Sequence, residues 1–535
     1  MRESISLMLL TCLVGVASSG GAAAQTVLVS VIEQHQNDMS YMVGDIDGDG
    51  LRDFLVHRWG PGVGYYIRMD VYSSRSGSLL LGIGPSPGTN FYHTRLGDVD
   101  GDGREDLGVD RRVTSSGGVQ KFLEVVSGST GLVLRSIAPS PSGQGGPYLM
   151  DDINGDGKAE YVVFDFRDVG GLVLAGQVDV IDGATGLVLR SHVGMAYELL
   201  RALPAELGDI DGDGFIDYVL ASDSFPGPNA WRVHSGATGS LITIYSPIGD
   251  QIGIGDVNAD GYEDVLQDWN VLGSYVQRVL AGPAFSQVLW SNSWVPASTP
   301  QYVYSAGRMG DFDGDGHSDF AVVDGQSGQT FMLSGRNQTV VVSYPPFGAI
   351  FLGIYRLLDS PGDVDGDGYP ELMMGGGTTP SSATVNVVSG APPGVSLFGA
   401  ACTDQTGQIP RIGVGVGARL GKTLTVNLSN ANPGLLAAVL GLGFSDLTWG
   451  GTALPLSLAF LNMPNCSWYV SGDVALTLPT VGLNGTRHHA THTIPVPAVT
   501  SLLGTSLYGQ WLVLESGPNG LTGSTTRAVR TTVVP

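Results

Sequence analysis

The stretch GDIDGDGLRDFLV, residues 44–56, places four carboxylates within nine residues of chain. The four are Asp45, Asp47, Asp49 and Asp53. Like charges held this close repel one another, and the single arginine of the stretch offsets only part of that repulsion. The fold of the chain depends on what these acids surround.

The same pattern occurs seven times. Its first aspartates are Asp45, Asp98, Asp152, Asp209, Asp256, Asp311 and Asp363, which are separated by 53 residues on average. We call these segments acidic loops 1 to 7 and number the positions in each from its first aspartate. Self-similarity at this period indicates stacked supersecondary units.

Comparison of the seven copies shows what each position requires. Positions 1, 3 and 5 are always Asp or Asn, position 9 is Asp or Glu, and position 6 is always Gly. Position 7 varies from leucine to histidine, as expected where the backbone carbonyl is the ligand. Oxygen ligands at positions 1, 3, 5, 7 and 9 around a glycine turn predict a Ca²⁺ cage, with up to seven structural ions in the chain.

The predicted metal ligands, loop by loop, are Asp45, Asp47, Asp49, Leu51 and Asp53; Asp98, Asp100, Asp102, Arg104 and Asp106; Asp152, Asn154, Asp156, Lys158 and Glu160; Asp209, Asp211, Asp213, Phe215 and Asp217; Asp256, Asn258, Asp260, Tyr262 and Asp264; Asp311, Asp313, Asp315, His317 and Asp319; and Asp363, Asp365, Asp367, Tyr369 and Glu371. An EF-hand would need Glu at position 12, where this chain has Val, Leu, Gln or Met, so each loop is expected to lead into a strand. Mg²⁺ is a weaker alternative, and metal-free Asx turns are another.

The charge balance agrees with bound cations. The chain has 50 acidic and 26 basic residues, a net charge of −24. Ligand positions hold 26 of the acids, and seven Ca²⁺ ions would reduce the net charge to −10. No basic patch predicts a nucleic-acid partner.

A second repeated signal lies between the loops. Segments such as VVSGSTGLVLRS from Val125 and VIDGATGLVLRS from Val180 predict a hairpin between two strands. Each unit of 53 residues thus contains about four strands and one acidic loop, the content of a propeller blade.

Together these residues resemble the FG-GAP/VCBS repeat family, over residues 25–395. The repeated Asp-x-Asp-x-Asp-Gly-x-x-Asp signature carries the resemblance, while of the eponymous elements only Gly390-Ala391-Pro392 is intact and Gly282-Pro283 is partial. The resemblance implies a seven-bladed β-propeller of the integrin α-subunit type, with structural cations on one rim. Residues 25–29 would close the ring by pairing with the last blade. Asn154, Asn258 and Ala259 depart from the pattern, so loops 3 and 5 are expected to bind more weakly.

Residues 396–535 lack acidic loops and contain short apolar runs separated by Gly and Pro turns, which predicts an antiparallel β-sandwich. Residues 435–440 are compatible with a short helix instead. Cys402 and Cys466 are expected to form a disulfide, with two buried free thiols as the alternative.

Residues 1–24 have the pattern of a secretory signal peptide, so we expect a secreted protein, extracellular or in the cell envelope. Lipidation of Cys12 is the alternative, for which residues 9–11 fit poorly. No later stretch is long and apolar enough for a transmembrane segment, and we expect a monomer.

The sequence contains no nucleophile elbow, zinc-protease motif or phosphate-binding loop. His488 and His492 share one face of a strand, which is not the usual zinc geometry. We expect a non-enzymatic binding protein whose partner is an extracellular protein or glycan. The alternative is a polysaccharide-active lyase or hydrolase. Candidate ligand-contacting aromatics are Trp59, Tyr65, Tyr66, Tyr92 and Trp231.

Overall fold

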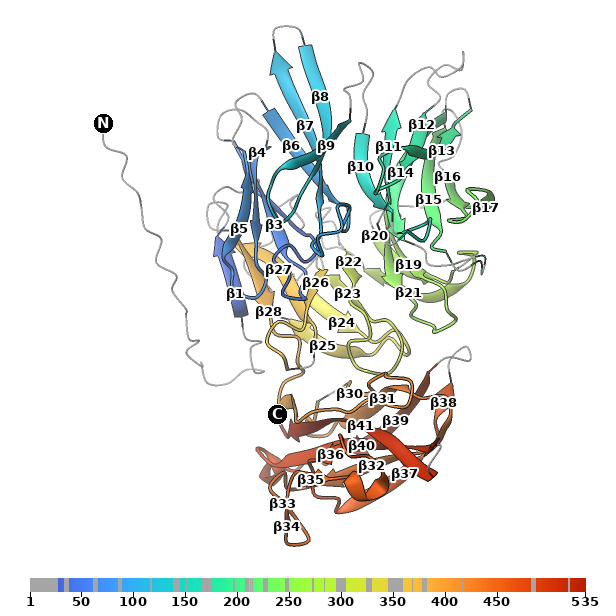
Figure 1. Ribbon diagram of the computed structural model, residues 1–535. Coiled ribbons are helices and arrows are strands. Elements are labelled where there is room, and N and C mark those ends of the chain that lie inside the picture. The colour runs from blue at the N-terminus through green and yellow to red at the C-terminus, as the bar shows by residue number, and fades with distance from the viewer. Residues whose placement is uncertain are drawn as a thin grey trace, which may run out of the picture.

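The chain is all-β and is built from many small antiparallel sheets (Figure 1). The computed structural model describes residues 27–535 except 33–37, 61–65, 85–88, 116–117, 138–144, 151, 157, 159, 166–175, 196–197, 207–210, 212, 214, 225–229, 246–249, 272–273, 283, 295–304, 324–329, 345–358, 368, 378–382, 416, 483–486 and 518–519. The signal-peptide prediction for residues 1–24 lies outside the described residues.

Residues 27–388, the seven-sheet region, form seven four-stranded sheets in which neighbouring strands follow one another in the chain. In chain order the strands of the first three sheets are β2 (Met39–Met42), β3 (Phe54–Trp59), β4 (Tyr66–Tyr72) and β5 (Leu79–Ile83); β6 (Thr89–Arg95), β7 (Leu107–Ser115), β8 (Gly118–Val126) and β9 (Val133–Ile137); and β10 (Gly145–Met150), β11 (Glu160–Asp165), β12 (Gln177–Ile181) and β13 (Val188–Val193). The next three contain β14 (Glu198–Glu206), β15 (Tyr218–Ser224), β16 (Ala230–His234) and β17 (Leu241–Tyr245); β18 (Asp250–Gly255), β19 (Asp264–Val271), β20 (Ser274–Leu280) and β21 (Val288–Trp294); and β22 (Ser305–Arg308), β23 (Phe320–Val323), β24 (Thr330–Leu333) and β25 (Val340–Tyr344).

The seventh sheet joins the two ends of this region. It contains β26 (Asp359–Gly362), β27 (Glu371–Gly377) and β28 (Ala383–Val388), and its fourth strand is β1 (Val27–Ile32), which pairs antiparallel with β28. The expected pairing of this early strand with the last sheet is therefore confirmed for the described residues. A salt bridge of 2.9 Å between Arg52 Nη1 and Asp359 Oδ1 also links the first sheet to the seventh.

Each acidic loop lies between the first and second strands of its sheet in chain order. In the first six sheets a glycine-containing hairpin lies between the third and fourth strands, and in the seventh the corresponding segment follows β28 and leads to β29. The second strands are packed on both faces, which explains their continuous apolar runs. Residues 54–58 of β3, for example, are all buried. The loops and hairpins of one sheet therefore lie at the same end of it, because each connects antiparallel strands of alternating direction.

Residues 395–535 form two larger antiparallel sheets, which we call the C-terminal sheet pair. One has the order β29-β41-β40-β32-β37 and the other β30-β31-β39-β38. Their bounds are β29 (Val395–Phe398), β30 (Arg411–Val414), β31 (Thr423–Ala431), β32 (Leu435–Gly443), β37 (Val474–Leu478), β38 (Val481–Gly482), β39 (His488–Pro495), β40 (Ser506–Gly517) and β41 (Gly520–Thr532). Short strands β33 (Thr448–Trp449), β34 (Thr452–Ala453), β35 (Leu456–Ser457) and β36 (Ser467–Trp468) and two 3₁₀ turns, η1 (Ala459–Leu461) and η2 (Thr500–Leu502), complete this part.

The helix considered for residues 435–440 is wrong, since they belong to β32. This strand pairs with β40 on one side and β37 on the other, so tertiary pairing satisfies its backbone groups on both edges. Trp511 of β40 is fully buried, and its Nε1 donates to the backbone carbonyl of Asn427 in β31, 3.0 Å away. That bond ties the two sheets of the pair together.

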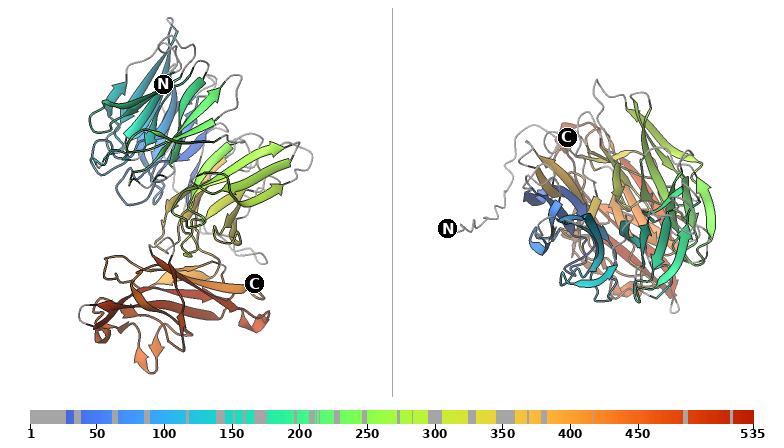
Figure 2. Two further views of the ribbon diagram at one scale, coloured as in Figure 1. Left: turned by 90° about the vertical axis from the view of Figure 1, so that its right-hand side faces the viewer. Right: turned by 90° about the horizontal axis from the view of Figure 1, so that it is seen from above.

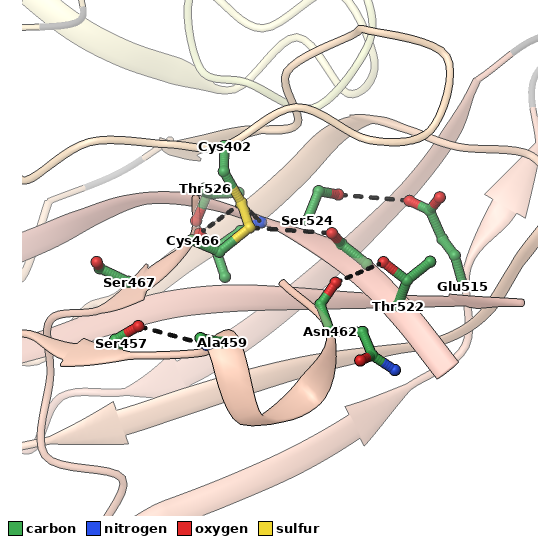
Figure 3. Close-up of a disulfide and its surroundings, with 12 residues drawn as sticks. Cys402, Ser457, Ala459, Asn462, Cys466, Ser467, Glu515, Thr522, Ser524 and Thr526 are labelled. Atoms are coloured by element: carbon green, nitrogen blue, oxygen red, sulfur yellow. Dashed lines mark hydrogen bonds between the residues drawn. A yellow bond between two sulfur atoms is a disulfide. The ribbon is translucent and has the colours of Figure 1, made fainter. Parts of the chain in front are cut away.

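Cys402 and Cys466 form a disulfide, with their Cα atoms 5.2 Å apart (Figure 3). The bond joins the segment after β29 to β36, and the backbone of Cys402 bridges to Thr525 of β41. The crosslink closes a loop of 64 residues inside the C-terminal sheet pair.

The C-terminal sheet pair lies against the sixth and seventh sheets of the seven-sheet region (Figures 1 and 2). One cluster of buried side chains runs from Phe312 and Tyr369 through Ile412 to Trp511. No helix among the described residues is long and apolar enough to cross a membrane.

Candidate metal centres

Several of the predicted ligand sets come together as acidic clusters that could hold metal ions. Six clusters of at least three His, Cys, Asp or Glu side chains occur among the described residues, each with one possible ligand atom per residue within 4.8 Å of the others. Five of them are Asp45, Asp47 and Asp53; Asp98, Asp100 and Asp106; Asp152, Asp156 and Glu160; Asp211, Asp213 and Asp217; and Asp363, Asp365, Asp367 and Glu371. The predicted ligand Asp209 lies outside the described residues.

Position 1 shapes loop 1 through its carboxylate. Asp45 Oδ1 accepts the N–H groups of Gly48 at 2.6 Å and Asp49 at 3.1 Å, and its Oδ2 accepts that of Gly50 at 2.7 Å. Gly48 and Gly50 have φ values of +81° and +85°, which L side chains rarely adopt. The turn therefore needs glycine at position 4 as well as at position 6.

Loop 5 breaks this requirement. Its position 4 is Ala259, which has φ +57° in the left-handed region. A Cβ in that conformation costs about 1 kcal/mol.

We therefore expect Ala259→Gly to raise the free energy of unfolding by up to about 1 kcal/mol in excess Ca²⁺ and to strengthen cation binding at loop 5. Urea denaturation and calcium calorimetry measure the two effects. The matched control is Gly48→Ala in loop 1, which should have the opposite sign. Equal stability of the two variants would contradict the backbone argument.

Position 5 also reaches the hairpin of its own sheet. Asp49 Oδ2 forms an ion pair of 2.6 Å with Arg75 Nε, and Ser129 Oγ donates to Asp102 Oδ2 at 2.5 Å. These two aspartates are absent from the clusters of loops 1 and 2 given above.

Position 9 has a structural role that the sequence did not reveal. Its seven carboxylates are all buried, with at most 1 % of the residue exposed: Asp53, Asp106, Glu160, Asp217, Asp264, Asp319 and Glu371. Asp53 Oδ2 accepts the N–H of Ile46 at position 2, 2.9 Å away, and its Oδ1 accepts that of Ser74 in the hairpin, 3.0 Å away. One side chain thus holds the acidic loop and the hairpin together.

The same bridge recurs along the chain. The N–H of position 2 reaches position 9 in loops 1, 2, 3, 5, 6 and 7. The hairpin N–H reaches it in loops 1, 2, 4, 5, 6 and 7. The acidic loop and the hairpin of one sheet are therefore joined by the position 9 carboxylate. The recurrence of both motifs in every repeat was the sequence pattern that could have predicted this contact.

The hairpin glycine is needed for close approach. A Cβ on Gly128 would lie 1.9 Å from the carbonyl oxygen of Glu105, and one on Gly335 would lie 2.0 Å from that of Ser318. In both cases the carbonyl belongs to position 8 of the loop. The backbone of the hairpin packs directly on the backbone of the loop.

The side chain of position 7 connects successive loops, although its variability suggested no role. Arg104 Nη1 and Lys158 Nζ each donate to the position 2 carbonyl of the preceding loop, at 3.2 Å. His317 Nδ1 lies 2.8 Å from the equivalent carbonyl of Val257. The missed signal is that position 7 of these three loops is a basic residue with a side-chain nitrogen donor.

Electrostatics favour a cation in these clusters. Burial, together with the nearby charges of Asp47 and Asp49, raises the pKa of Asp53 to about 7, against the backbone N–H groups that lower it. Burial likewise raises the pKa of Asp106 to about 6 and that of Glu371 to about 8. Asp311 Oδ1 in loop 6 is buried without a hydrogen-bond partner. Oxygen donors, crowded negative charge and an unsatisfied carboxylate oxygen all fit a hard divalent cation.

These pKa shifts predict how the cation-free protein responds to pH. The folded chain keeps protons on its position 9 carboxyl groups that the unfolded chain releases near pH 4, so folding is favoured at low pH. In EDTA, the urea midpoint should fall as the pH rises from about 5 to about 8. In saturating Ca²⁺ the fall should vanish, because the cation binds the deprotonated carboxylates. A midpoint in EDTA that rises over this range would contradict the prediction.

Asparagine at position 3 changes two of the clusters. Asn154 Nδ2 donates to Glu160 Oε1 at 2.9 Å, and Asn258 Nδ2 donates to Asp260 Oδ2 at 2.9 Å. Each amide removes one negative charge and satisfies a neighbouring carboxylate. The weaker binding expected of loops 3 and 5 stays a prediction, for which these bonds supply a physical reason.

The aromatic candidates for ligand contact are mostly interior. Tyr66 and Trp231 are buried, and half-buried Trp59 stacks edge-on against Tyr66 with ring centroids 5.2 Å apart. Tyr65 and the side chain of Tyr92 lie outside the described residues. The described aromatics of this set pack inside their sheets.

No family model and no curated protein matches the chain. Solved structures resemble it distantly. A structure of oligogalacturonate lyase in complex with manganese has a TM-score of 0.38 at 10% identity, covering 69% of this chain and 98% of that one. A chain of the mitotic checkpoint complex has a TM-score of 0.34 at 9% identity, covering 72% and 99%. These are likenesses to β-propeller proteins, and at such scores no functional argument rests on them.

Proposed function

We propose that the chain is a secreted, Ca²⁺-stabilised, seven-bladed β-propeller of the FG-GAP/VCBS kind, followed by a β-sandwich, and that it binds an extracellular ligand without catalysis. The observation that carries the proposal is the set of seven buried position 9 carboxylates, each beside further acids. Buried carboxylates in such groups are stable only when a cation or protons compensate them.

The donor set supports Ca²⁺. Four side-chain oxygens and one backbone carbonyl per loop approach the number that Ca²⁺ accepts in flexible geometry, with water completing the shell. The presence of an acidic loop in every one of the seven sheets supports a structural role. Each cation would stabilise one loop and, through the position 9 carboxylate, one hairpin.

The same contacts argue against acid–base chemistry by these carboxylates. Position 9 is held by two backbone N–H groups and position 1 by three, as in loop 1. Carboxylates occupied by these backbone donors, and by a cation, have few lone pairs left to exchange a proton with a substrate.

The outermost strands supply a surface for a protein ligand. Leu132 and Leu187, at the hairpins that lead into β9 and β13, are 67% and 68% exposed, and Val133 and Val188 beside them are about half exposed. Aliphatic side chains on unpaired edge strands suit association with another protein better than with a glycan.

The test is binding of the mature protein to a glycan array and to a panel of purified extracellular matrix proteins, each in Ca²⁺ and in EDTA. We expect a protein ligand bound in Ca²⁺ and lost in EDTA, and weaker binding by Leu132→Asp/Leu187→Asp. Arg111→Asp is the control, on β7 away from the outermost strand. Release of new reducing ends or unsaturated sugars from a polysaccharide would contradict the proposal and favour the enzyme.

A further inference from the structure

Acidic loop 6 differs from the other loops because the C-terminal sheet pair covers it. Asp313 and Asp315, its positions 3 and 5, are each 4% exposed. The corresponding acids of loops 1, 2, 4 and 7 are partly or fully exposed. The cover comes from β30 and β31, more than 90 residues farther along the chain.

The contact is made at atomic distance. Asn427 Nδ2 of β31 donates to the backbone carbonyl of Asp313 at 2.9 Å and reaches its Oδ1 at 3.5 Å. Gly413 of β30 lies so close that a Cβ there would be 2.0 Å from the same carbonyl oxygen. From the neighbouring loop, the hydroxyl of Tyr369 accepts the N–H of Val414 at 2.9 Å.

The covered site contains unsatisfied polar atoms. Asp311 Oδ1 and Asn427 Oδ1 are both buried without a hydrogen-bond partner, and Asn427 is 1% exposed. An amide whose nitrogen contacts Asp313 therefore leaves its own oxygen unpaired at the edge of the acidic cluster. Such atoms are normally satisfied by a partner that is a polar group, a water or an ion.

The charges of the covered site do not balance by themselves. Loop 6 holds four carboxylates, those of Asp311, Asp313, Asp315 and Asp319. The basic side chains that act on them are Arg411, which acts on Asp311, and His317 and Arg336, which act on Asp315. Four carboxylates outnumber these basic groups, and a divalent cation would offset the excess of negative charge buried between the two parts of the chain.

We propose that loop 6 is a cation-dependent docking surface, on which the C-terminal sheet pair seats only when a divalent cation neutralises the loop. The inference rests on the proposed function, because it needs loop 6 to bind the cation. It adds a second role for one of the seven loops, which is to join the seven-sheet region to the C-terminal sheet pair.

The test keeps 1 mM Ca²⁺ throughout, so that the other loops stay loaded, and alters loop 6 alone. Asp311→Ala removes a ligand but leaves three buried carboxylates. We expect it to lose one bound Ca²⁺ in calorimetry, to raise the radius of gyration in small-angle scattering, and to speed amide exchange of residues 411–415 at least about tenfold. The control Asp98→Ala, in exposed loop 2, should lose one Ca²⁺ while docking is unchanged.

A rescue variant separates charge from misfolding. Asp311→Ala/Asp313→Asn/Asp315→Asn binds no cation at loop 6 but carries two fewer buried charges, so it should regain the compact radius and slow exchange. Gly413→Val, which touches no carboxylate, should release the sheet pair while the number of bound Ca²⁺ ions stays at the wild-type value.

Three outcomes would overturn the inference: Asp311→Ala loses its cation but stays docked, the triple variant is as open as Asp311→Ala, or Gly413→Val remains compact. Failure of the proposed function is a different result, in which neither Asp98→Ala nor Asp311→Ala changes the number of Ca²⁺ ions bound.

Discussion

Chelation of divalent cations should lower the free energy of unfolding of the seven-sheet region by about 10 kcal/mol relative to 1 mM Ca²⁺. Extracellular Ca²⁺ modules bind with dissociation constants near ~10⁻⁴ M, at which each site contributes about 1.4 kcal/mol. Seven such sites approach the whole stability of an ordinary domain, about 5–15 kcal/mol. Differential scanning calorimetry in Ca²⁺ and in EDTA measures the change.

The C-terminal sheet pair provides the internal control for this experiment. Its described strands carry no acidic loop and its disulfide joins Cys402 to Cys466, so its own transition should move little on chelation. A seven-sheet transition that keeps its temperature in EDTA would refute the structural role of the cations. Equal shifts of both transitions would point to a nonspecific salt effect.

Asp106→Ala should destabilise the protein even without a cation, because the position 9 carboxylate has a second task. Asp106 Oδ2 accepts the N–H of Val99 at 3.0 Å, and its Oδ1 accepts that of Gly128 at 3.0 Å. Two buried donors left without an acceptor cost about 1–3 kcal/mol each, so we expect a loss of about 4 kcal/mol. Urea denaturation in EDTA at pH 5 measures this loss. At that pH, below the pKa of about 6 that burial gives Asp106, relief of buried charge adds little.

The matched control is Asp100→Ala in the same loop. Asp100 is exposed at position 3, and its Oδ1 accepts only the N–H of Asp102 within the loop, at 3.0 Å. Its replacement should cost about 1.4 kcal/mol in 1 mM Ca²⁺, the contribution of one site, and much less in EDTA. If Asp106→Ala and Asp100→Ala lowered the free energy of unfolding equally in EDTA, the hydrogen bond from the hairpin to Asp106 would not contribute to stability.

Much of the candidate site could be predicted because its residues lie close together in the chain. Nine consecutive positions contain all the ligands of one loop, so comparing seven copies reveals which positions need a carboxylate and which need glycine. The need for glycine at position 4 was visible in the same way, and Ala259 marks the one departure.

The roles of position 9 and position 7 could not be predicted in this way. Asp53 meets Ser74, 21 residues away, and His317 meets Val257, 60 residues away. The residue types of the two loops do not predict these hydrogen-bond partners, because each partner is a backbone N–H or carbonyl group, which almost every residue has.

The sequence by itself determined the repeat, the acidic clusters, the strand that follows each loop and the pairing of the early strand β1 with the last sheet. These features depend on the spacing of acids and glycines within each loop and on the alternation of strands and turns, both of which can be read directly from the sequence. The tertiary structure alone decided that Asp313 and Asp315 of loop 6 are buried while the corresponding acids of loop 7 are not. Burial is set by what folds over a segment, and the strands that cover Asp313 come from a part of the chain that has no acidic loop.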